Sequence, residues 1–196
     1  MLRLDLVIGP NGAGKTTFVR KTLVPVLPSG VAFVNADEIA ARRWPEDPEG
    51  KAYEAARVAD ATRRALLEAH QPFVAETVFS HPSKLELIDT AQAAGYTVLV
   101  HVLLVPEDLS AARVAHRVAA GGHSVPEEKI RLRHRRLWPY AAAAVARADA
   151  ATIYDNSANA GPRIVAQMVS GASVGTVHWP AWAPEALAVA WPTTGA

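Results

Sequence analysis

Gly9-Pro10-Asn11-Gly12-Ala13-Gly14-Lys15-Thr16 sets the architecture of this 196-residue chain. The octapeptide fits the pattern GxxxxGK[ST] and stands between an apolar run at 4–8 and a helical pattern at 15–23. Glycines let the backbone N–H groups of such a turn point at phosphate oxygens, and the helix that follows adds the partial positive charge of its N-terminus. The pattern predicts a phosphate-binding loop whose nucleotide-binding residues are Gly9, Asn11, Gly12, Ala13, Gly14, Lys15, Thr16 and Thr17.

Two side chains of this loop have distinct predicted roles. Lys15 supplies a cation for the β- and γ-phosphates of ATP or GTP, and the Thr16 hydroxyl is a ligand for Mg²⁺. The plainer alternative is a glycine-rich turn followed by an unrelated lysine. The strand before the loop and the helix after it favour the phosphate loop.

Apolar runs alternate with helical patterns along the chain, which predicts a parallel sheet covered on both faces. We expect an α/β fold of the P-loop NTPase, nucleoside-kinase-like type: a three-layer α/β/α sandwich with a mostly parallel five-stranded sheet and a helical lid. The predicted strands are 4–8, 31–35, 73–75, 96–105 and 152–154. A further helix is predicted at 162–170 and an edge strand at 174–179.

Composition narrows the class of protein. Half of the residues are apolar and the net charge is +1, so a disordered chain is excluded and overall charge gives no indication of a nucleic-acid partner. The chain contains no cysteine, which excludes disulfides and thiolate metal sites. The longest apolar run, 97–106, is too short to cross a bilayer. With no secretory pattern at the N-terminus, we expect a cytoplasmic protein without a membrane partner.

The domain organisation is predicted from composition. Residues 1–170 are expected to form one kinase domain that includes a lid at about 113–138. Residues 171–196 are rich in Trp and Pro, and they are expected to form an extension packed on the same domain. A partner-binding surface is the alternative reading of this extension.

Two carboxylates follow predicted strands, at the sheet edge where ligands of parallel sheets gather. Asp37 could accept the proton of an attacking hydroxyl, or it could cap the helix that starts near Glu38. Glu76 could hold Mg²⁺ or bind the acceptor, or it could be a capping or surface carboxylate. Thr77 and Ser80 add hydroxyls to the loop after Glu76. We predict Asp37 as the base, these four residues as the acceptor side, and Thr16 with Glu76 as the metal site.

Positive charge is concentrated at 113–136, where the local balance is +5. The segment reads as helix, Gly121-Gly122, helix, which is the form of a lid that closes over a triphosphate. Arg117 lies before the glycines, while Arg133 and Arg136 share one helical face. These arginines are predicted to neutralise the transferring phosphoryl group. A solvated basic face is the main alternative, and a nucleic-acid surface is less favoured because few aromatic residues are interleaved.

The last predicted strand ends at Asp155-Asn156-Ser157. Asn156 could hydrogen-bond the edge of an adenine base, or the segment could be a simple Asx turn.

Five stretches, in order, resemble the small zeta-toxin-like P-loop kinases over residues 1–170. They are 9–17, Asn35-Ala36-Asp37, Ala75-Glu76-Thr77, Gly121-Gly122-His123-Ser124-Val125-Pro126 and Asp155-Asn156-Ser157. The resemblance implies ATP or GTP with Mg²⁺ and an acceptor hydroxyl of UDP-N-acetylglucosamine. It implies that Asp37 is the base, that Glu76 contacts acceptor or metal, and that Arg117, Arg133 and Arg136 act from the lid. It adds an antitoxin protein as a candidate partner.

The sequence therefore predicts an ATP-dependent kinase with a small-molecule acceptor that carries an alcohol group. The sugar-binding segments of zeta toxins have no residue-by-residue match here, so another metabolite is an open alternative. A nucleotide-dependent switch whose output is a partner contact is the second hypothesis, and a nucleic-acid end kinase is the third.

Overall fold

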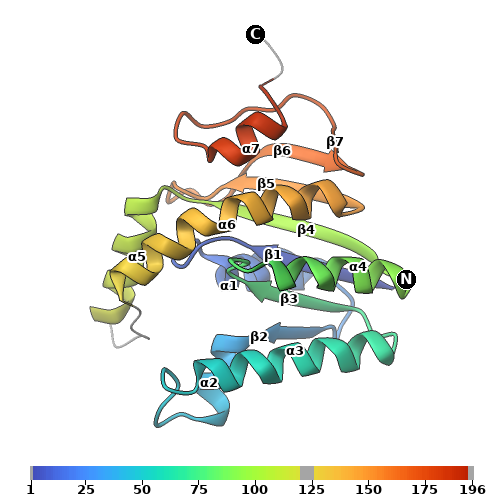
Figure 1. Cartoon of the computed structure of the whole chain (residues 1–196), viewed down its shortest axis with the longest axis vertical. Coiled ribbons are helices and arrows are strands. Elements are labelled where there is room, and N and C mark those ends of the chain that lie inside the picture. Colours follow the sequence, from blue (N-terminus) through green and yellow to red (C-terminus); the bar gives the residue numbers. More distant parts are fainter. Residues whose placement is uncertain (1, 120–125, 194–196) are drawn as a thin grey trace.

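The computed structural model describes residues 2–119 and 126–193, and it contains a seven-stranded sheet in the order β2-β3-β1-β4-β5-β6-β7 (Figure 1). The first five strands in that order are parallel, and β6 and β7 are antiparallel to their neighbours. The strands are β1 (Arg3–Ile8), β2 (Ala32–Asn35), β3 (Phe73–Thr77), β4 (Thr97–Leu104), β5 (Ala150–Asp155), β6 (Arg163–Val169) and β7 (Ala172–Ser173). The predicted α/β fold with a mostly parallel sheet is confirmed.

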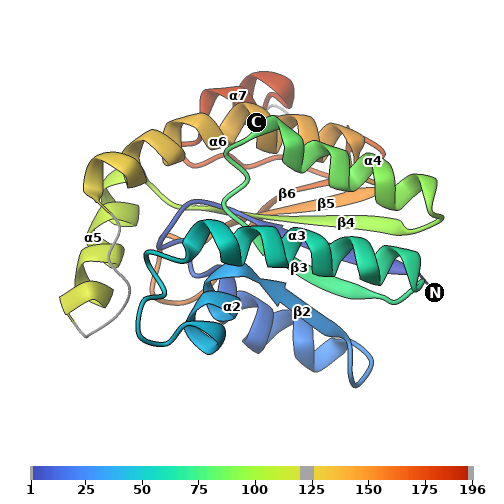
Figure 2. The same ribbon diagram turned by 60° about the horizontal axis from the view of Figure 1, so that its bottom comes forward.

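Helices cover both faces of this sheet. In Figure 1, α3, α4 and α6 lie in front of the strands and α1 lies behind them, and the turned view of Figure 2 shows the same division. The helix α1 continues directly into a π-helical turn at Val19–Leu23. The helices are α1 (Lys15–Phe18), α2 (Ala36–Arg43), α3 (Ala52–Glu68), α4 (Leu85–Ala93), α5 (Glu107–Ala119), α6 (Glu127–Arg147) and α7 (Glu185–Ala190).

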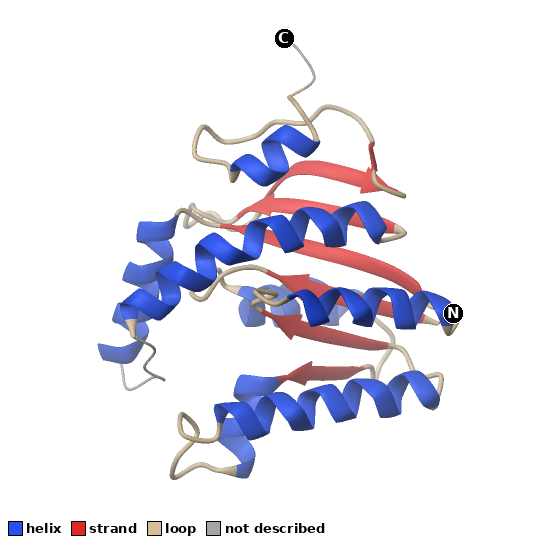
Figure 3. Ribbon diagram, viewed as in Figure 1, coloured by secondary structure: helices blue, strands red, loops and turns tan. Residues whose placement is uncertain are grey.

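The predicted strand count of five is wrong, because two C-terminal segments extend the sheet (Figure 3). The predicted helix at 162–170 is the strand β6, whose Val165, Ala166 and Met168 are buried while Ile164 is exposed. Pairing with the preceding strand β5 decides this conformation, and this contact overrides the helical reading of the segment. The predicted edge strand at 174–179 is also wrong. The edge is the two-residue β7, and the following residues add only isolated hydrogen bonds to β6, such as Val174 N–H to the Gln167 carbonyl at 2.8 Å.

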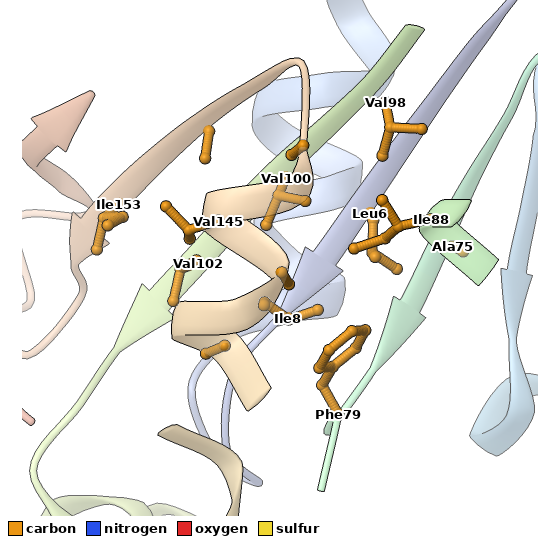
Figure 4. Close-up of a cluster of buried hydrophobic side chains, with 14 of the residues drawn as sticks. Leu6, Ile8, Ala75, Phe79, Ile88, Val98, Val100, Val102, Val145 and Ile153 are labelled. Atoms are coloured by element: carbon orange, nitrogen blue, oxygen red, sulfur yellow. The ribbon is translucent and has the colours of Figure 1, made fainter. Parts of the chain in front are cut away.

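The central strands are buried on both faces, as expected for a parallel sheet between two helical layers. Leu6 and Ile8 of β1 belong to the large cluster beneath α4 and α6 that Figure 4 shows, together with Val100 of β4. Val7 faces the other way and packs with Phe18, which follows the phosphate loop. The core therefore holds the loop between β1 and α1 in a fixed position.

The C-terminal extension contributes to the same core. Val177 and Leu187 are fully buried in it, and Trp182 packs against its edge. The indole N–H of Trp179 donates to the Trp191 carbonyl at 2.7 Å. The described part of the extension therefore packs on the same core as the sheet, and the predicted domain bounds stay a prediction. None of the described helices is long and apolar enough to cross a membrane.

Candidate active site

The phosphate loop is held in shape by contacts that only glycine permits. Gly12 has φ +69°, and a Cβ added there would lie 2.7 Å from the Ser110 carbonyl oxygen. Ser110, which is completely buried in α5, donates its hydroxyl proton to the Asn11 carbonyl. The loop therefore fits against α5, and residues far apart in the chain complete it.

Lys15 is only 7% exposed although it carries a charge. Its ammonium group donates to the Pro10 carbonyl oxygen at 2.8 Å, across the turn of the loop. Burial lowers the pKa of Lys15 because desolvation disfavours the cation, while the nearby Glu76 and Asp37 carboxylates oppose that shift. A buried cation in the first turn of α1 suits a phosphate chain.

Thr16 is hydrogen-bonded to Glu76, which joins the loop to the end of β3. The Thr16 hydroxyl lies 2.9 Å from Glu76 Oε2 and 3.1 Å from Oε1. Asn35 at the end of β2 donates its side-chain N–H to Glu76 Oε2 at 2.8 Å. Three neighbouring strand ends thus bring their polar groups together, and the role of Glu76 as a mere surface carboxylate does not fit this geometry. Asn35 was not predicted as a site residue.

The donor set at Thr16 and Glu76 fits Mg²⁺, which prefers hydroxyl and carboxylate oxygens and keeps several waters. The described residues contain no cluster of three or more His, Cys, Asp or Glu that could hold a metal by itself. The ion would therefore rely on Thr16, on Glu76 and on phosphate oxygens of the nucleotide.

The pKa of Glu76 is raised, because burial penalises its charged form more than Lys15 and Thr16 favour it. In the pH window between the ordinary pKa of 4.5 and the raised pKa of the folded protein, Glu76 keeps its proton in the folded state and has lost it in the unfolded chain. The contribution of this group to stability is complete below that window and is lost as pH rises through it.

Glu76→Gln is expected to remove this pH-dependent contribution. The free energy of unfolding of the wild type relative to the variant should therefore fall as pH rises through the window, which urea unfolding at a series of pH values measures. The variant should also need about tenfold more Mg²⁺ for half-maximal nucleotide binding. An unchanged Mg²⁺ requirement would remove Glu76 from the metal site.

The Asp37 carboxylate faces the site and does not cap α2. The N-cap of α2 is Asn35, whose side-chain oxygen accepts from the backbone N–H groups of Asp37 at 2.8 Å and Glu38 at 3.4 Å. Asp37 is exposed and lines the cavity described next. The capping alternative raised from the sequence is therefore wrong for Asp37, and its carboxylate is available for chemistry.

A cavity of about 540 Å³ joins these groups. It is lined by the phosphate loop, the ends of β2 and β3, one face of α3 and three arginines of α5 and α6. Thr77 and Ser80, which were predicted on the acceptor side, both line it. The Thr77 hydroxyl accepts from the Phe79 backbone N–H at 3.2 Å, which holds the turn after β3.

The arginine segment divides into two groups. Arg117 and Arg133 line the cavity as predicted, together with Arg113, which was missed although it stands four residues before Arg117 on the same helical face. Arg131 and Arg135 instead pair with Glu107 at 3.1 and 3.0 Å and so join α6 to α5.

Arg136 is exposed and is not among the residues that line the cavity. Its predicted catalytic role stays a prediction, and the proposal below depends on Arg133. The glycine pair and His123 expected at the lid hinge lie outside the described residues.

Asn156 supports the phosphate loop from the end of β5. Its side-chain N–H donates to the Ala13 carbonyl at 2.7 Å, and its own carbonyl accepts from Arg113 at 2.9 Å. The Asx turn considered from the sequence is present at Asp155, whose Oδ1 accepts from the Ser157 backbone N–H at 2.9 Å. An adenine contact by Asn156 stays a prediction.

Comparison with known proteins agrees with this geometry. A family model described as an AAA domain (AAA_33) matches residues 4–140, from β1 into α6. The chain belongs to this AAA domain family. The matched part of this AAA domain contains the phosphate loop, Asp37, Glu76 and the three cavity-lining arginines.

One protein of similar sequence and two solved structures of similar fold can be compared with this AAA domain. An uncharacterized protein of Haemophilus influenzae is 26% identical over 129 residues, which cover 64% of this chain and 88% of that protein. A chain of the AvrRxo1-ORF1:-ORF2 structure with ATP has a TM-score of 0.62 at 17% identity over 88% of this chain. A chain of the PezAT toxin–antitoxin system of Streptococcus pneumoniae has a TM-score of 0.61 at 13% identity, covering 84% of this chain and 71% of that one. Such similarity shows the P-loop kinase-like fold, and this chain spans 60% of the AvrRxo1 chain.

Proposed function

We propose that this AAA domain is a kinase that transfers the γ-phosphoryl group of ATP to a hydroxyl of a small molecule. The observation that carries the proposal is the cavity of about 540 Å³, which brings together a phosphate loop, a free carboxylate and three arginines. A nucleotide-binding module without transfer would have no need for Asp37 beside the phosphates.

The acceptor hydroxyl would lie between Asp37 and the γ-phosphorus atom. Its oxygen forms a bond to that phosphorus while the bond to the bridging oxygen of ADP breaks, and ADP leaves with the electron pair. The hydroxyl proton passes to the Asp37 carboxylate. Asn35 supports this step, because it fixes the N-terminus of α2 and hence the position of Asp37.

Cations of the site would stabilise the negative charge of the phosphoryl group in flight. Lys15 contacts the phosphate chain from the loop, and Arg113, Arg117 and Arg133 reach the cavity from α5 and α6. Forked guanidinium donors suit phosphoryl oxygens better than a single ammonium does. Thr16 and Glu76 would hold Mg²⁺, which would supply further neutralisation of the phosphate charge.

UDP-N-acetylglucosamine is the first acceptor that we propose. The ordered motifs that resemble zeta toxins support it, and so does the likeness of the fold to a chain of the PezAT toxin–antitoxin structure. By the same reasoning we propose a cytoplasmic location and an antitoxin-type protein as a candidate partner. A different hydroxyl-bearing metabolite would use the same site chemistry.

The test is transfer from γ-labelled ATP with Mg²⁺ to a panel of acceptors led by UDP-N-acetylglucosamine. We expect label in an acceptor for the wild type and a loss of label of at least about 100-fold in Asp37→Asn. Label in free phosphate alone, with every acceptor unlabelled, would contradict the proposal and favour a nucleotide-dependent switch.

A further inference from the structure

One face of α3 forms part of the cavity wall. Ala52, Ala56, Ala59 and Arg63 follow one another at intervals of three or four residues, so they share this face, and all four line the cavity. The alanines leave room for a ligand. The charge that α3 presents to this space is the guanidinium of Arg63.

Arg63 is buried yet incompletely paired. It is 4% exposed, and one terminal nitrogen donates to Asp60 Oδ1 at 2.6 Å. The other lies 3.4 Å from the Glu76 carbonyl oxygen, which is a long contact, and the buried Nε has no hydrogen-bond partner among the described residues. Burial lowers the pKa of Arg63, but a guanidinium stays charged in proteins. It therefore keeps donor capacity for a ligand.

Lys84 adds a second cation at the same place. It lies in the turn that follows the loop after Glu76, and it lines the cavity. Its ammonium nitrogen is 3.0 Å from Asp60 Oδ1, the same oxygen that Arg63 contacts. Two cations thus meet at one carboxylate, which is 44% exposed, and the group keeps a net positive charge.

The rest of the cavity makes this position distinctive. Lys15, Arg113, Arg117 and Arg133 also line the cavity, but the phosphate chain of ATP would occupy these cations. Arg63 and Lys84 are the cavity-lining arginine and lysine that remain for an anionic group of the acceptor.

We propose that Arg63 and Lys84 form an acceptor subsite for an anionic group, so that the acceptor is a hydroxy compound that also carries a carboxylate or a phosphate. The subsite rests on the proposed kinase function for its role in turnover. The anion displaces Asp60 as the partner of both cations, and the hydroxyl at the other end of the acceptor reaches Asp37. The alanine face of α3 accommodates the carbon skeleton between the two ends.

The test compares three acceptors of similar size: glycerol, D-glycerate and glycerol 3-phosphate. The wild type should phosphorylate one or both anionic compounds at lower KM than glycerol, and the two arms separate carboxylate from phosphate. Lys84→Gln should raise KM for the anionic acceptor at least about tenfold, since a charge-assisted hydrogen bond is lost, and leave KM for ATP unchanged. Asp60→Asn should lower the same KM, because it removes the competing carboxylate.

Changes of KM in opposite directions in Lys84→Gln and Asp60→Asn distinguish a ligand subsite from a structural ion pair. A rise of KM in both variants, or no change in either, would overturn the proposal. Lys51→Gln is the matched control, because Lys51 forms a comparable pair with Glu54 at 3.0 Å but does not line the cavity. It should leave every KM unchanged.

Failure of the kinase proposal would be seen separately. If no compound accepts label, inorganic phosphate is titrated calorimetrically into protein that is saturated with AMP-PNP and Mg²⁺, so that the phosphate loop is filled. Binding at least about tenfold weaker in Lys84→Gln than in Lys51→Gln would support the subsite without any turnover. Equal affinity in the two variants would overturn it.

Discussion

Asp37→Asn is expected to lower kcat by about 100- to 10,000-fold while the affinity for ATP stays within about twofold of the wild type. The carboxylate is exposed in the cavity, and Asn35 already caps α2, so the substitution removes a proton acceptor and no structural bond of α2. Single-turnover transfer measures the rate, and a fluorescent ATP analogue measures binding. Transfer within about threefold of the wild-type rate would remove Asp37 from the mechanism.

Glu38→Gln is the control for this experiment. Glu38 is the next residue in the same helical turn, and it pairs with Arg20 at 2.7 Å and Arg42 at 3.0 Å. The control removes an equal charge close to the site. Both partners are well exposed, so a fall in rate as large as that of Asp37→Asn would point to general electrostatics and not to a base.

Lys15→Met is expected to lower kcat/KM for ATP by about 100- to 1,000-fold, because it removes a cation aimed at the transferring phosphoryl group. The fold should survive. Lys15 is buried and its pKa is lowered by desolvation, so a neutral side chain of similar length avoids the cost of burying a charge. Thermal unfolding should therefore show a midpoint equal to or above that of the wild type.

Lys21→Met serves as the matched substitution, since Lys21 is exposed just beyond α1. It should change neither kcat/KM nor the unfolding midpoint. If Lys15→Met unfolded the protein, the ammonium contact with the Pro10 carbonyl at 2.8 Å would be the dominant role of Lys15, contrary to expectation.

The position of a site residue could be predicted from the sequence where a local pattern fixes it. The phosphate loop has its spacing in eight consecutive residues, and Asp37 and Glu76 come directly after strands, so their place at the sheet edge follows from the parallel topology. Asp37, Glu76 and most of the predicted loop residues line one cavity, whereas Gly9 and Ala13 do not line it. Asn35 was overlooked although it stands at a strand end and precedes the helix that it caps, which is a readable signal.

Other features depend on how the elements pack against one another and could not be predicted in this way. Arg63 is one of several arginines in α3, and only the rotation of that helix against the sheet decides that it, and not Arg64, is buried. The strand β6 begins after Pro162, a common helix start, and its pairing with β5 overrides that preference. The position of Arg136 outside the cavity likewise follows from how α6 lies against α5, which spacing on one helix cannot reveal.

The support of the phosphate loop has a consequence for the order of events during synthesis on the ribosome. The octapeptide leaves the exit tunnel early, but the Ser110 hydroxyl and the Asn156 amide that hold its carbonyl groups follow 99 and 143 residues later. A nascent or truncated chain that ends before β5 carries the complete motif without these two contacts. ATP binding should therefore require a chain that extends beyond β5, and a translation product that ends earlier is expected not to bind ATP.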